Sequence, residues 1–395
     1  MSAAPTGAHP SPVRVVMVAT RTRPEIGGIE AHVAEVAARL AGRVDLEVLT
    51  TDRTGELPRR ERVETPDGAS YVVRRFRAFP RGRDWYASPG LGLALLRARA
   101  DVVHVQGVHT LVPPLALLVA LLRRLPVLLT FHSGGSSSAF RTRVRGLQWR
   151  LLAPLLRRAD LLVGVSEYER DRFADVVDGP VTLVRNGGAL PDPGAVEVDR
   201  GLVVSNGRLE RYKGHQRAVA MLPHLVETHP DARLRILGSG PQEAELLEQA
   251  ARLGVADRVE VHAVDPDDRV GMAREVAAAG AALLLSEYEA HPVAVMEALD
   301  LGRPVVVART SGLTELADLG WARGVEIDAD PATTARAVAA QLDDPVLPPH
   351  DALPTWDGCA DALHDLYLGV LADRTAGPAP RTAVTPRQEA SAVRG

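Results

Sequence analysis

The feature that most limits the possible folds is a regular alternation of short apolar runs with longer segments of helical periodicity. In the first half the apolar runs are 13–19, 45–50, 102–106, 127–131, 161–166 and 181–184. Unbroken apolar runs between helices are typical of parallel strands that helices cover on both faces. The alternation resumes at 201–205 and continues to 304–308. Because 395 residues exceed what one hydrophobic core usually supports, we predict two α/β domains.

Composition and charge narrow the class of protein further. A hydrophobic content of 46% and a net charge of −4 are typical of a soluble globular protein. The single cysteine, Cys359, excludes an internal disulfide framework and suits a reducing cytoplasm. The most apolar run, 111–122, is too short to span a bilayer, and we expect it to be a buried helix. Residues 1–190 carry 27 basic and 18 acidic side chains and 191–395 carry 19 and 32, which indicates different surfaces for different partners.

Two loops of the second half place charged residues at strand ends. Glu289 follows the run 281–285, and Glu297 lies five residues after Pro292, which suits the first turn of a helix. Arg208 and Lys213 follow the run 201–205, and Lys213 is the only lysine among 46 basic residues. Because the carboxyl ends of parallel strands line one crevice, both loops can face the same ligand. The helix start between the two carboxylates offers free N–H groups, at Val293 and Ala294, as a seat for phosphate.

Two loops of the first half have a similar position. Gly27 and Gly28 lie between the first strand and a helix over 28–40, where backbone can approach a ligand closely. An ordinary tight turn would have the same sequence. His132 ends the run 127–131 and opens a polar loop, where a histidine can serve either as a structural hydrogen bonder or as a contact to a ligand.

Together these motifs resemble family 4 of the retaining glycosyltransferases. The residues that carry the resemblance are GRLERYKG (207–214), E-x7-E from Glu289 to Glu297, GRPVVV (302–307), SGLTE (311–315), GGIE (27–30) and TFH (130–132). The resemblance covers about residues 13 to 372 and implies the GT-B fold, in which two Rossmann-like, doubly wound domains face a central cleft. It places the acceptor domain at 13–189, a linker at 190–200, the donor domain at 201–353 and a helix crossing back at 354–373. Residues 1–12 and 374–395 are expected to be a disordered leader and tail.

The resemblance also implies roles for individual residues. Arg208 and Lys213 would neutralise the departing diphosphate, Glu289 would hold the donor sugar, Glu297 the ribose, and His132 would contact the sugar from the opposite domain. The remaining donor-binding candidates are Gly27, Gly28, Gly207, Val264, His291, Val293, Ala294, Gly312 and Leu313. We expect a UDP- or GDP-sugar cosubstrate, no cofactor and no metal, because Asp330 in EIDAD is better explained as a helix N-cap.

Several alternatives stay open. Many relatives have glycine two or three residues after the first glutamate of E-x7-E, whereas this chain has His291 and Pro292, and proline lacks an N–H. A non-catalytic sugar-nucleotide binder is therefore one alternative, and a pyridoxal-phosphate enzyme using Lys213 is a more remote one. The acceptor is a small molecule or natural-product intermediate, or a lipid-linked glycan. The basic helix expected over 141–158 either faces the core or touches the inner membrane face, and no nucleic acid partner is indicated.

Overall fold

The protein consists of two α/β units, each with a mainly parallel sheet. The structure is a computed structural model that describes residues 12–376 except 26, 81–85 and 134–138, and only the backbone of 139–147, 350 and 376. The first sheet contains β1 (Arg14–Ala19), β2 (Asp45–Asp52), β3 (Arg60–Glu64), β4 (Ser70–Arg77), β5 (Val102–Gln106), β6 (Val127–Thr130), β7 (Leu161–Gly164) and β8 (Thr182–Leu183). Its strand order is β3-β4-β2-β1-β5-β6-β7-β8, and every pair except β3–β4 is parallel. The predicted doubly wound fold is confirmed for this half.

Helices cover both faces of the first sheet because its central strands are buried on both sides. The helices are α1 (Gly28–Leu40), α2 (Pro89–Arg97), α3 (Val112–Leu122), α4 (Ala139–Leu156) and α5 (Glu167–Val177). All five residues of β5 are buried, and they contribute to both apolar layers. One layer packs α2, α3, α4 and α5 against the sheet, and the other packs α1 with the last helix, α12 (Trp356–Ala376).

The second unit repeats this plan with six parallel strands. They are β9 (Asp199–Asn206), β10 (Arg233–Leu237), β11 (Val259–His262), β12 (Ala279–Leu284), β13 (Val305–Ala308) and β14 (Arg323–Val325), in the order β11-β10-β9-β12-β13-β14. The helices are α6 (His215–Thr228), α7 (Glu243–Arg252), α8 (Arg269–Ala277), α9 (Val293–Asp300), α10 (Ser311–Asp318) and α11 (Pro331–Asp343), with short 3₁₀ turns η1 (Arg211–Lys213), η2 (Ala256–Arg258) and η3 (His350–Ala352). One face carries α6, α7 and α11, and the other α8, α9 and α10.

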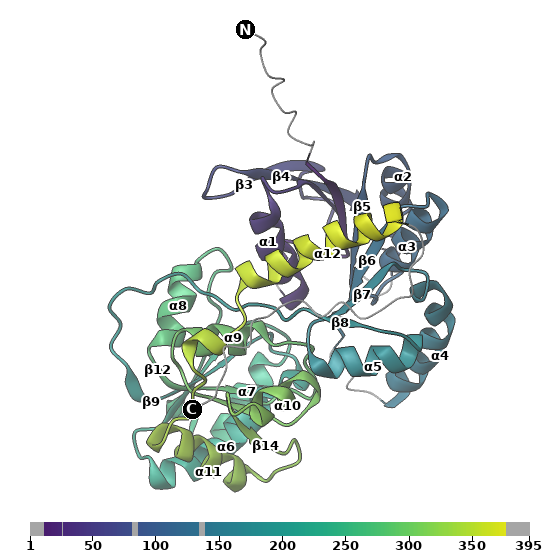
Figure 1. Ribbon diagram of the computed structural model, residues 1–395. Helices are drawn as coiled ribbons and strands as arrows, with labels where there is room; N and C mark the ends of the chain where they lie inside the picture. Colours follow the sequence, from purple (N-terminus) through teal and green to yellow (C-terminus); the bar gives the residue numbers. More distant parts are fainter. Residues whose placement is uncertain (1–11, 26, 81–85, 134–138, 377–395) are drawn as a thin grey trace, which may run out of the picture.

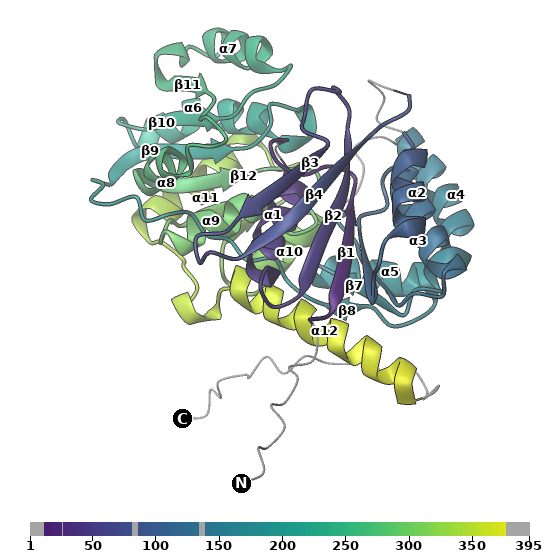
Figure 2. The ribbon, with the colours of Figure 1, turned by 90° about the horizontal axis from the view of Figure 1, so that it is seen from above.

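The last helix joins the two units. α12 starts beside the second unit and crosses the first, where it lies next to α1 (Figures 1 and 2). The backbone of Gly187, which follows β8, passes so close that a Cβ there would lie 2.1 Å from the amide nitrogen of Trp356. The chain thus crosses between the units in close contact with the start of α12. None of the helices in the described part of the chain is long and apolar enough to cross a bilayer.

Candidate donor site at the domain junction

Lys213 and Glu289 meet at the carboxyl end of the second sheet. Lys213 ends η1 after β9, and Glu289 lies in the loop between β12 and α9. Gly214 has a φ of +81°, and a Cβ there would lie 2.0 Å from the carbonyl oxygen of Leu285, so the η1 loop rests directly on the end of β12. This contact brings Lys213 Nζ to 2.6 Å from Glu289 Oε1, with both side chains less than one-fifth exposed. The sequence predicted that these two residues line one crevice, and in the structure they form an ion pair.

Arg208 lies beside this pair and is more open to solvent. Its side chain is 48% exposed, and its Nη2 donates a 2.6 Å hydrogen bond to the hydroxyl of Tyr212. The Tyr212 ring stacks on Tyr288, with centroids 4.7 Å apart, and Lys213 Nζ lies 5.5 Å from the Tyr212 centroid. The two tyrosines were not among the predicted site residues. The sequence could have indicated them, because each directly precedes a predicted site residue, Lys213 or Glu289.

Glu297 lies deeper and has a cationic partner of its own. Its Oε1 is 2.5 Å from Nη2 of Arg269, the first residue of α8, and the Glu297 side chain is 7% exposed. Burial raises the pKa of Glu297 above its ordinary value, and the charge of Arg269 acts in the opposite direction. Arg269 was missed because it comes from a helix start rather than from a strand-end motif.

The helix that carries Glu297, α9, begins one residue later than expected. Pro292 is the N-cap of α9 in an extended conformation, with φ −80° and ψ 103°, and Val293 is the first helical residue. The prediction that Pro292 lies in the first turn is therefore wrong by one position, because ψ at Pro292 is outside the helical range. Amides at the first helical positions have no intrahelical acceptor, so those of Val293 and Ala294 stay available to an anion.

The turn at Gly312 and Leu313 offers less to a phosphate than the sequence suggested. The Gly312 amide donates to the carbonyl oxygen of Glu289 at 3.0 Å, and the Leu313 amide donates to that of Thr310 at 2.8 Å. The Leu313 side chain is fully buried in the core. Both amides already have acceptors, so a phosphate would have to compete with these bonds, and donor binding by Gly312 and Leu313 stays a prediction. The Gly312 bond holds the Glu289 loop.

The remaining glycine and valine candidates lie at the starts of helices or the ends of strands of both units. A Cβ at Gly28 would meet nothing within 4 Å, whereas one at Gly27 would lie 2.3 Å from Glu30 Oε2. Gly207 has a φ of +153°, and its Cβ position is 3.7 Å from Cδ of Lys213. Val264 follows β11 and packs, half-buried, against the α8–α9 core. Gly28 therefore leaves open space at the start of α1, whereas Gly207 packs against Lys213 and His215.

His132 belongs to a buried polar cluster of the first unit. Its Nε2 is 2.8 Å from Gln106 Oε1, and its ring centroid is 4.7 Å from that of His32. His32 Nδ1 is in turn 2.8 Å from Oδ1 of Asn186. Burial lowers the pKa of His132 well below its ordinary value and that of His32 to about 4, so both rings are neutral at pH 7. His32, Gln106 and Asn186 were missed, although Asn186 lies in the turn VRNGG that closes the first unit.

His291 has neither ring nitrogen hydrogen-bonded among the described residues, although its side chain is only 5% exposed. Burial lowers its pKa to about 3, and the charge of Arg185 adds to the effect. An unpaired buried imidazole costs stability. We regard it as a candidate hydrogen-bonding partner for a ligand at this junction.

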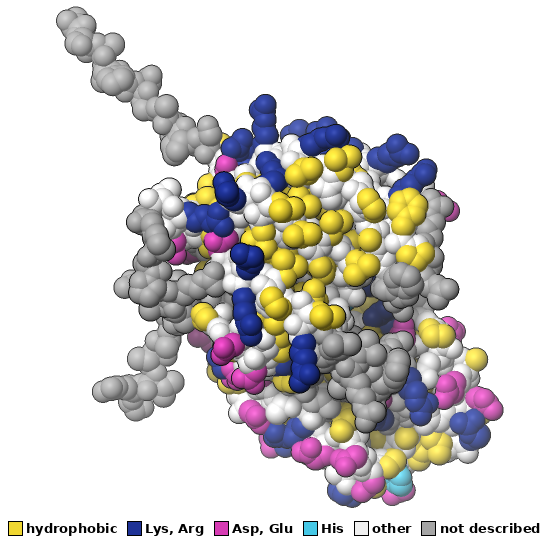
Figure 3. Space-filling model, turned by 90° about the vertical axis from the view of Figure 1, so that its right-hand side faces the viewer, with side chains coloured by type: hydrophobic (Ala, Val, Ile, Leu, Met, Phe, Trp, Pro, Cys, Tyr) yellow, Lys and Arg dark blue, Asp and Glu magenta, His cyan; other side chains and the backbone are white. Residues whose placement is uncertain are grey.

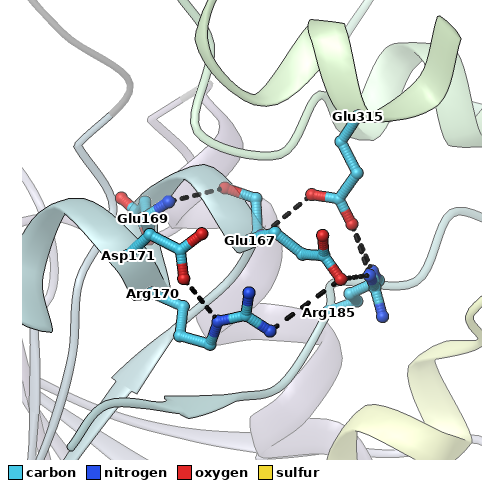
Figure 4. A network of polar contacts seen from close by, with 7 residues as sticks. Glu167, Glu169, Arg170, Asp171, Arg185 and Glu315 are labelled. Atoms are coloured by element: carbon cyan, nitrogen blue, oxygen red, sulfur yellow. Dashed lines mark hydrogen bonds and ion pairs between the residues drawn. The ribbon is translucent and has the colours of Figure 1, made fainter. Parts of the chain in front are cut away.

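A second polar contact crosses between the units beside this site. Glu315 of α10 lies against the first turn of α5 and against Arg185, which follows β8 (Figure 4). Its Oε2 accepts a 2.8 Å hydrogen bond from the Glu167 amide, and its Oε1 accepts one of 2.8 Å from Arg185 Nε. Glu315 stands at the end of the SGLTE motif, but no role was predicted for it.

Within the described ranges no group of three or more His, Cys, Asp or Glu side chains is arranged to hold a metal ion. Asp330 caps α11 as predicted, since its Oδ1 accepts a 2.7 Å hydrogen bond from the Thr333 amide.

Comparisons with known proteins agree with this arrangement. The family described as Glycosyltransferase Family 4 matches residues 26–188, and Glycosyl transferases group 1 matches 191–352. The chain is 30% identical to a glycogen synthase of Mycobacterium tuberculosis over 90% of this chain and 94% of that protein. It is 28% identical to a D-inositol 3-phosphate glycosyltransferase of Acidothermus cellulolyticus, over 98% and 95%. The sucrose-phosphate synthase of Thermosynechococcus elongatus has the same fold, with a TM-score of 0.71 at 20% identity over 91% of this chain and 99% of that one.

Proposed function

Because the chain belongs to the glycosyltransferases with the GT-B fold, we propose that it moves a sugar from a nucleotide diphosphate to an acceptor hydroxyl, with retention at the anomeric carbon and without a metal ion. The observation that carries this proposal is the cationic pair Arg208 and Lys213 beside Glu289 and the open helix start at Val293. Metal-free departure of a diphosphate needs fixed positive charge of this kind.

The chemistry follows from where charge develops. As the anomeric C–O bond breaks, negative charge grows on the diphosphate, and Lys213, Arg208 and the first amides of α9 stabilise it. An ammonium has three N–H donors, so Lys213 can bind phosphate while it keeps its contact with Glu289. The acceptor oxygen attacks on the face that the diphosphate leaves, and the acceptor proton passes to the released phosphate oxygen.

The carboxylates and histidines would hold the rest of the donor. Glu289 accepts hydrogen bonds from the sugar hydroxyls, and Glu297, held by Arg269, accepts from the ribose hydroxyls. His132 approaches the sugar from the first unit as a neutral ring, which can donate or accept. Pro292 removes one amide, and this favours a non-catalytic binder as the second candidate. Release of nucleotide in the presence of an acceptor separates the two candidates.

Ligand binding tests the proposal first. Melting curves are recorded with UDP, GDP and dTDP and their sugars in EDTA, where a ligand at 100 times its Kd adds about 2.7 kcal/mol of stability. A shift with one nucleotide supports the proposal and identifies the base, and no shift with any of them at millimolar concentration refutes it.

Substitution then tests the assigned cation. Lys213→Ala should reduce turnover by about 10²-fold or more, the usual loss when a charge-stabilising donor is removed. Arg211→Ala is the matched control, since Arg211 lies on the same 3₁₀ turn, is 71% exposed and pairs with Glu245. Equal turnover in Lys213→Ala and the control would mean that the site is wrongly assigned.

The first unit, which we expect to bind the acceptor, has an exposed apolar surface. Leucines of three neighbouring helices are 47–72% exposed there and form what we name the leucine face: Leu93, Leu96, Leu118, Leu122 and Leu151. The expectation that 111–122 is a buried helix is therefore only half right, because one flank of α3 is open. Figure 3 shows the apolar side chains of this face with basic side chains around them, and these are arginines because the only lysine, Lys213, lies in the second unit. The face extends the predicted membrane contact beyond the helix 141–158, whose side chains up to 147 lie outside the described residues.

We propose that the leucine face rests on an anionic bilayer, where a lipid-linked acceptor would be found. Residues 79–159 contain twelve arginines but only two acidic residues, Asp84 and Asp101. A shallow surface cavity of about 260 Å³ beside Leu93 is lined by Arg74 and Arg97 and could seat an acidic headgroup. Each basic residue near an anionic surface contributes about 1 kcal/mol, and the leucines add apolar burial. With Cys359 unpaired and buried, we place the protein at the cytoplasmic face.

Vesicle flotation tests this contact. The protein should float with vesicles of phosphatidylglycerol and phosphatidylcholine but not with phosphatidylcholine alone, and Leu122→Glu should abolish flotation. Leu247→Glu, at a 44% exposed leucine of the second unit, should leave it unchanged. Absence of wild-type flotation rejects the membrane contact. A dimer in solution that Leu122→Glu disrupts would show instead that a second copy covers the face.

A further inference from the structure

Glu315 is a nearly buried carboxylate that belongs to one unit and is bound by the other. Its side chain is 8% exposed, although it lies on α10 of the second unit and its partners, Arg185 and the Glu167 amide, belong to the first (Figure 4). Arg185 Nη2 also reaches Glu167 Oε1 at 3.2 Å, so one guanidinium binds both carboxylates. Removing one partner from a buried ion pair is far more costly than losing an exposed one.

The start of α10 is fixed to the Glu289 loop. Ser311 Oγ accepts a hydrogen bond from the Glu289 amide and donates one to the Glu289 carbonyl oxygen, both at 2.8 Å. The Gly312 amide donates a second hydrogen bond to the same carbonyl, and a Cβ at Gly312 would lie 2.0 Å from the carbonyl oxygen of Ala290. The Glu289 loop and the first turn of α10 therefore move together.

The start of α5 is fixed in the same way to the His132 loop. The Glu169 carboxylate is fully buried and accepts hydrogen bonds from the Val165 amide at 3.0 Å and from the Ser133 amide. Ser133 directly follows His132. A Cβ at Gly164 would lie 2.9 Å from the Arg170 amide nitrogen, so the end of β7 packs tightly on this turn.

We propose that Glu315 is a positioning residue that sets Glu289 of the second unit in register with His132 of the first. The inference rests on the proposed function, in which these two residues hold opposite sides of one donor sugar. Glu315 connects the two fixed loops, because α10 carries the Glu289 loop and the turn that Glu315 binds carries the His132 loop. A loosened connection changes the geometry of the reacting sugar, whereas the nucleotide stays bound to the second unit.

Graded substitutions separate positioning from folding. Glu315→Gln keeps the shape and an acceptor for the Glu167 amide but loses the charge, and Glu315→Ala loses both. Since a misplacement of about 1 Å can cost 10²-fold in rate, we expect kcat to fall about 10-fold in the first variant and about 10²-fold in the second. Nucleotide Kd, measured by calorimetry, should stay within about twofold. Asp318→Asn is the matched control on α10, because its partner Arg309 lies 2.6 Å away in the same unit.

Measuring the distance between the two units tests directly whether Glu315 holds them in register. Spin labels are attached at Leu122→Cys in the first unit and Glu227→Cys in the second, while the native Cys359 is 3% exposed and stays unlabelled. The distance distribution should broaden in Glu315→Ala and stay narrow in Asp318→Asn. Unchanged kcat and distances in Glu315→Ala overturn the inference, and so does a loss of kcat matched by equal losses of nucleotide affinity and melting temperature. If wild-type protein binds no nucleotide, the proposed function fails, and the distances alone still decide whether Glu315 connects the units.

Discussion

At the scale of single residues, His291 has the largest unused hydrogen-bonding capacity in the described site. Both of its nitrogens lack partners, so His291→Phe removes two buried polar atoms while keeping a ring of similar size. We expect the free energy of unfolding to rise by about 1–3 kcal/mol, the cost of leaving such a group unpaired. Donor affinity should fall about 10-fold if His291 binds the donor, as the sequence predicts. Melting curves and calorimetry measure the two effects.

The control for this change is His224→Phe, which removes a 43% exposed imidazole from α6. It should alter neither stability nor donor affinity by more than a small amount. A His291→Phe protein that is stabilised but binds donor as tightly as wild type would contradict the binding role and show that the ring only fills the loop.

The residue scale also shows what sequence patterns can and cannot predict about a site. Lys213 and Glu289 could be paired in advance because both follow parallel strands of one sheet, whose carboxyl ends share an edge. Arg269 could not be predicted as the partner of Glu297, because a helix start carries no comparable signal of what it faces. The acceptors of the Gly312 and Leu313 amides could not be predicted either, because they depend on a loop conformation that the sequence does not reveal.

At the scale of elements, the packing of α12 leads us to expect opposite changes in stability when two glycines are replaced by alanine. In Gly187→Ala the new Cβ would lie 2.1 Å from the Trp356 amide nitrogen, with backbone on that side, so α12 must shift and stability should fall by more than about 1 kcal/mol. Gly369 is exposed inside α12 with nothing within 4 Å of its Cβ position, so Gly369→Ala should stabilise by about 0.5–1 kcal/mol. Urea unfolding curves measure both, and a destabilised Gly369→Ala would contradict the packing of α12.

Elements with a continuous apolar sequence were predictable, and those with mixed sequence were not. β5 occupies 102–106 as expected because its five residues are all buried. β3 and β4 were missed because neither is a continuous apolar run: β3 (RERVE) contains one apolar residue, and β4 (SYVVRRFR) contains three arginines. The open flank of α3 could not be predicted either, since a helix that is apolar all round gives no sign of which side faces the core.

At the scale of the whole molecule, both units contain buried histidines whose pKa values are lowered. Burial lowers the pKa of His32 and His215 to about 4 and that of His291 to about 3, and it lowers those of His104 and His132 well below 6.5. In the unfolded chain these rings titrate near 6.5. Between pH 6.5 and about 4 the unfolded state therefore binds protons that the folded state does not. Each ring then costs up to about 1.4 kcal/mol of folding free energy per pH unit.

Three buried or half-buried carboxyl groups, Glu25, Glu169 and Glu297, have raised pKa values and act in the opposite direction. Burial raises the pKa of Glu169 to about 7, so the folded state holds this proton more tightly and gains stability as pH falls from 7 to about 4.5. Because five rings outweigh these three carboxyls, we expect the melting temperature to fall from pH 6.5 to 5. In His291→Phe the melting temperature should fall less, because one of the five buried rings is gone. In His224→Phe it should fall as in the wild type. A melting temperature that stays constant over this range would show that water or protons reach these rings in the folded protein, and the junction would then be open rather than closed.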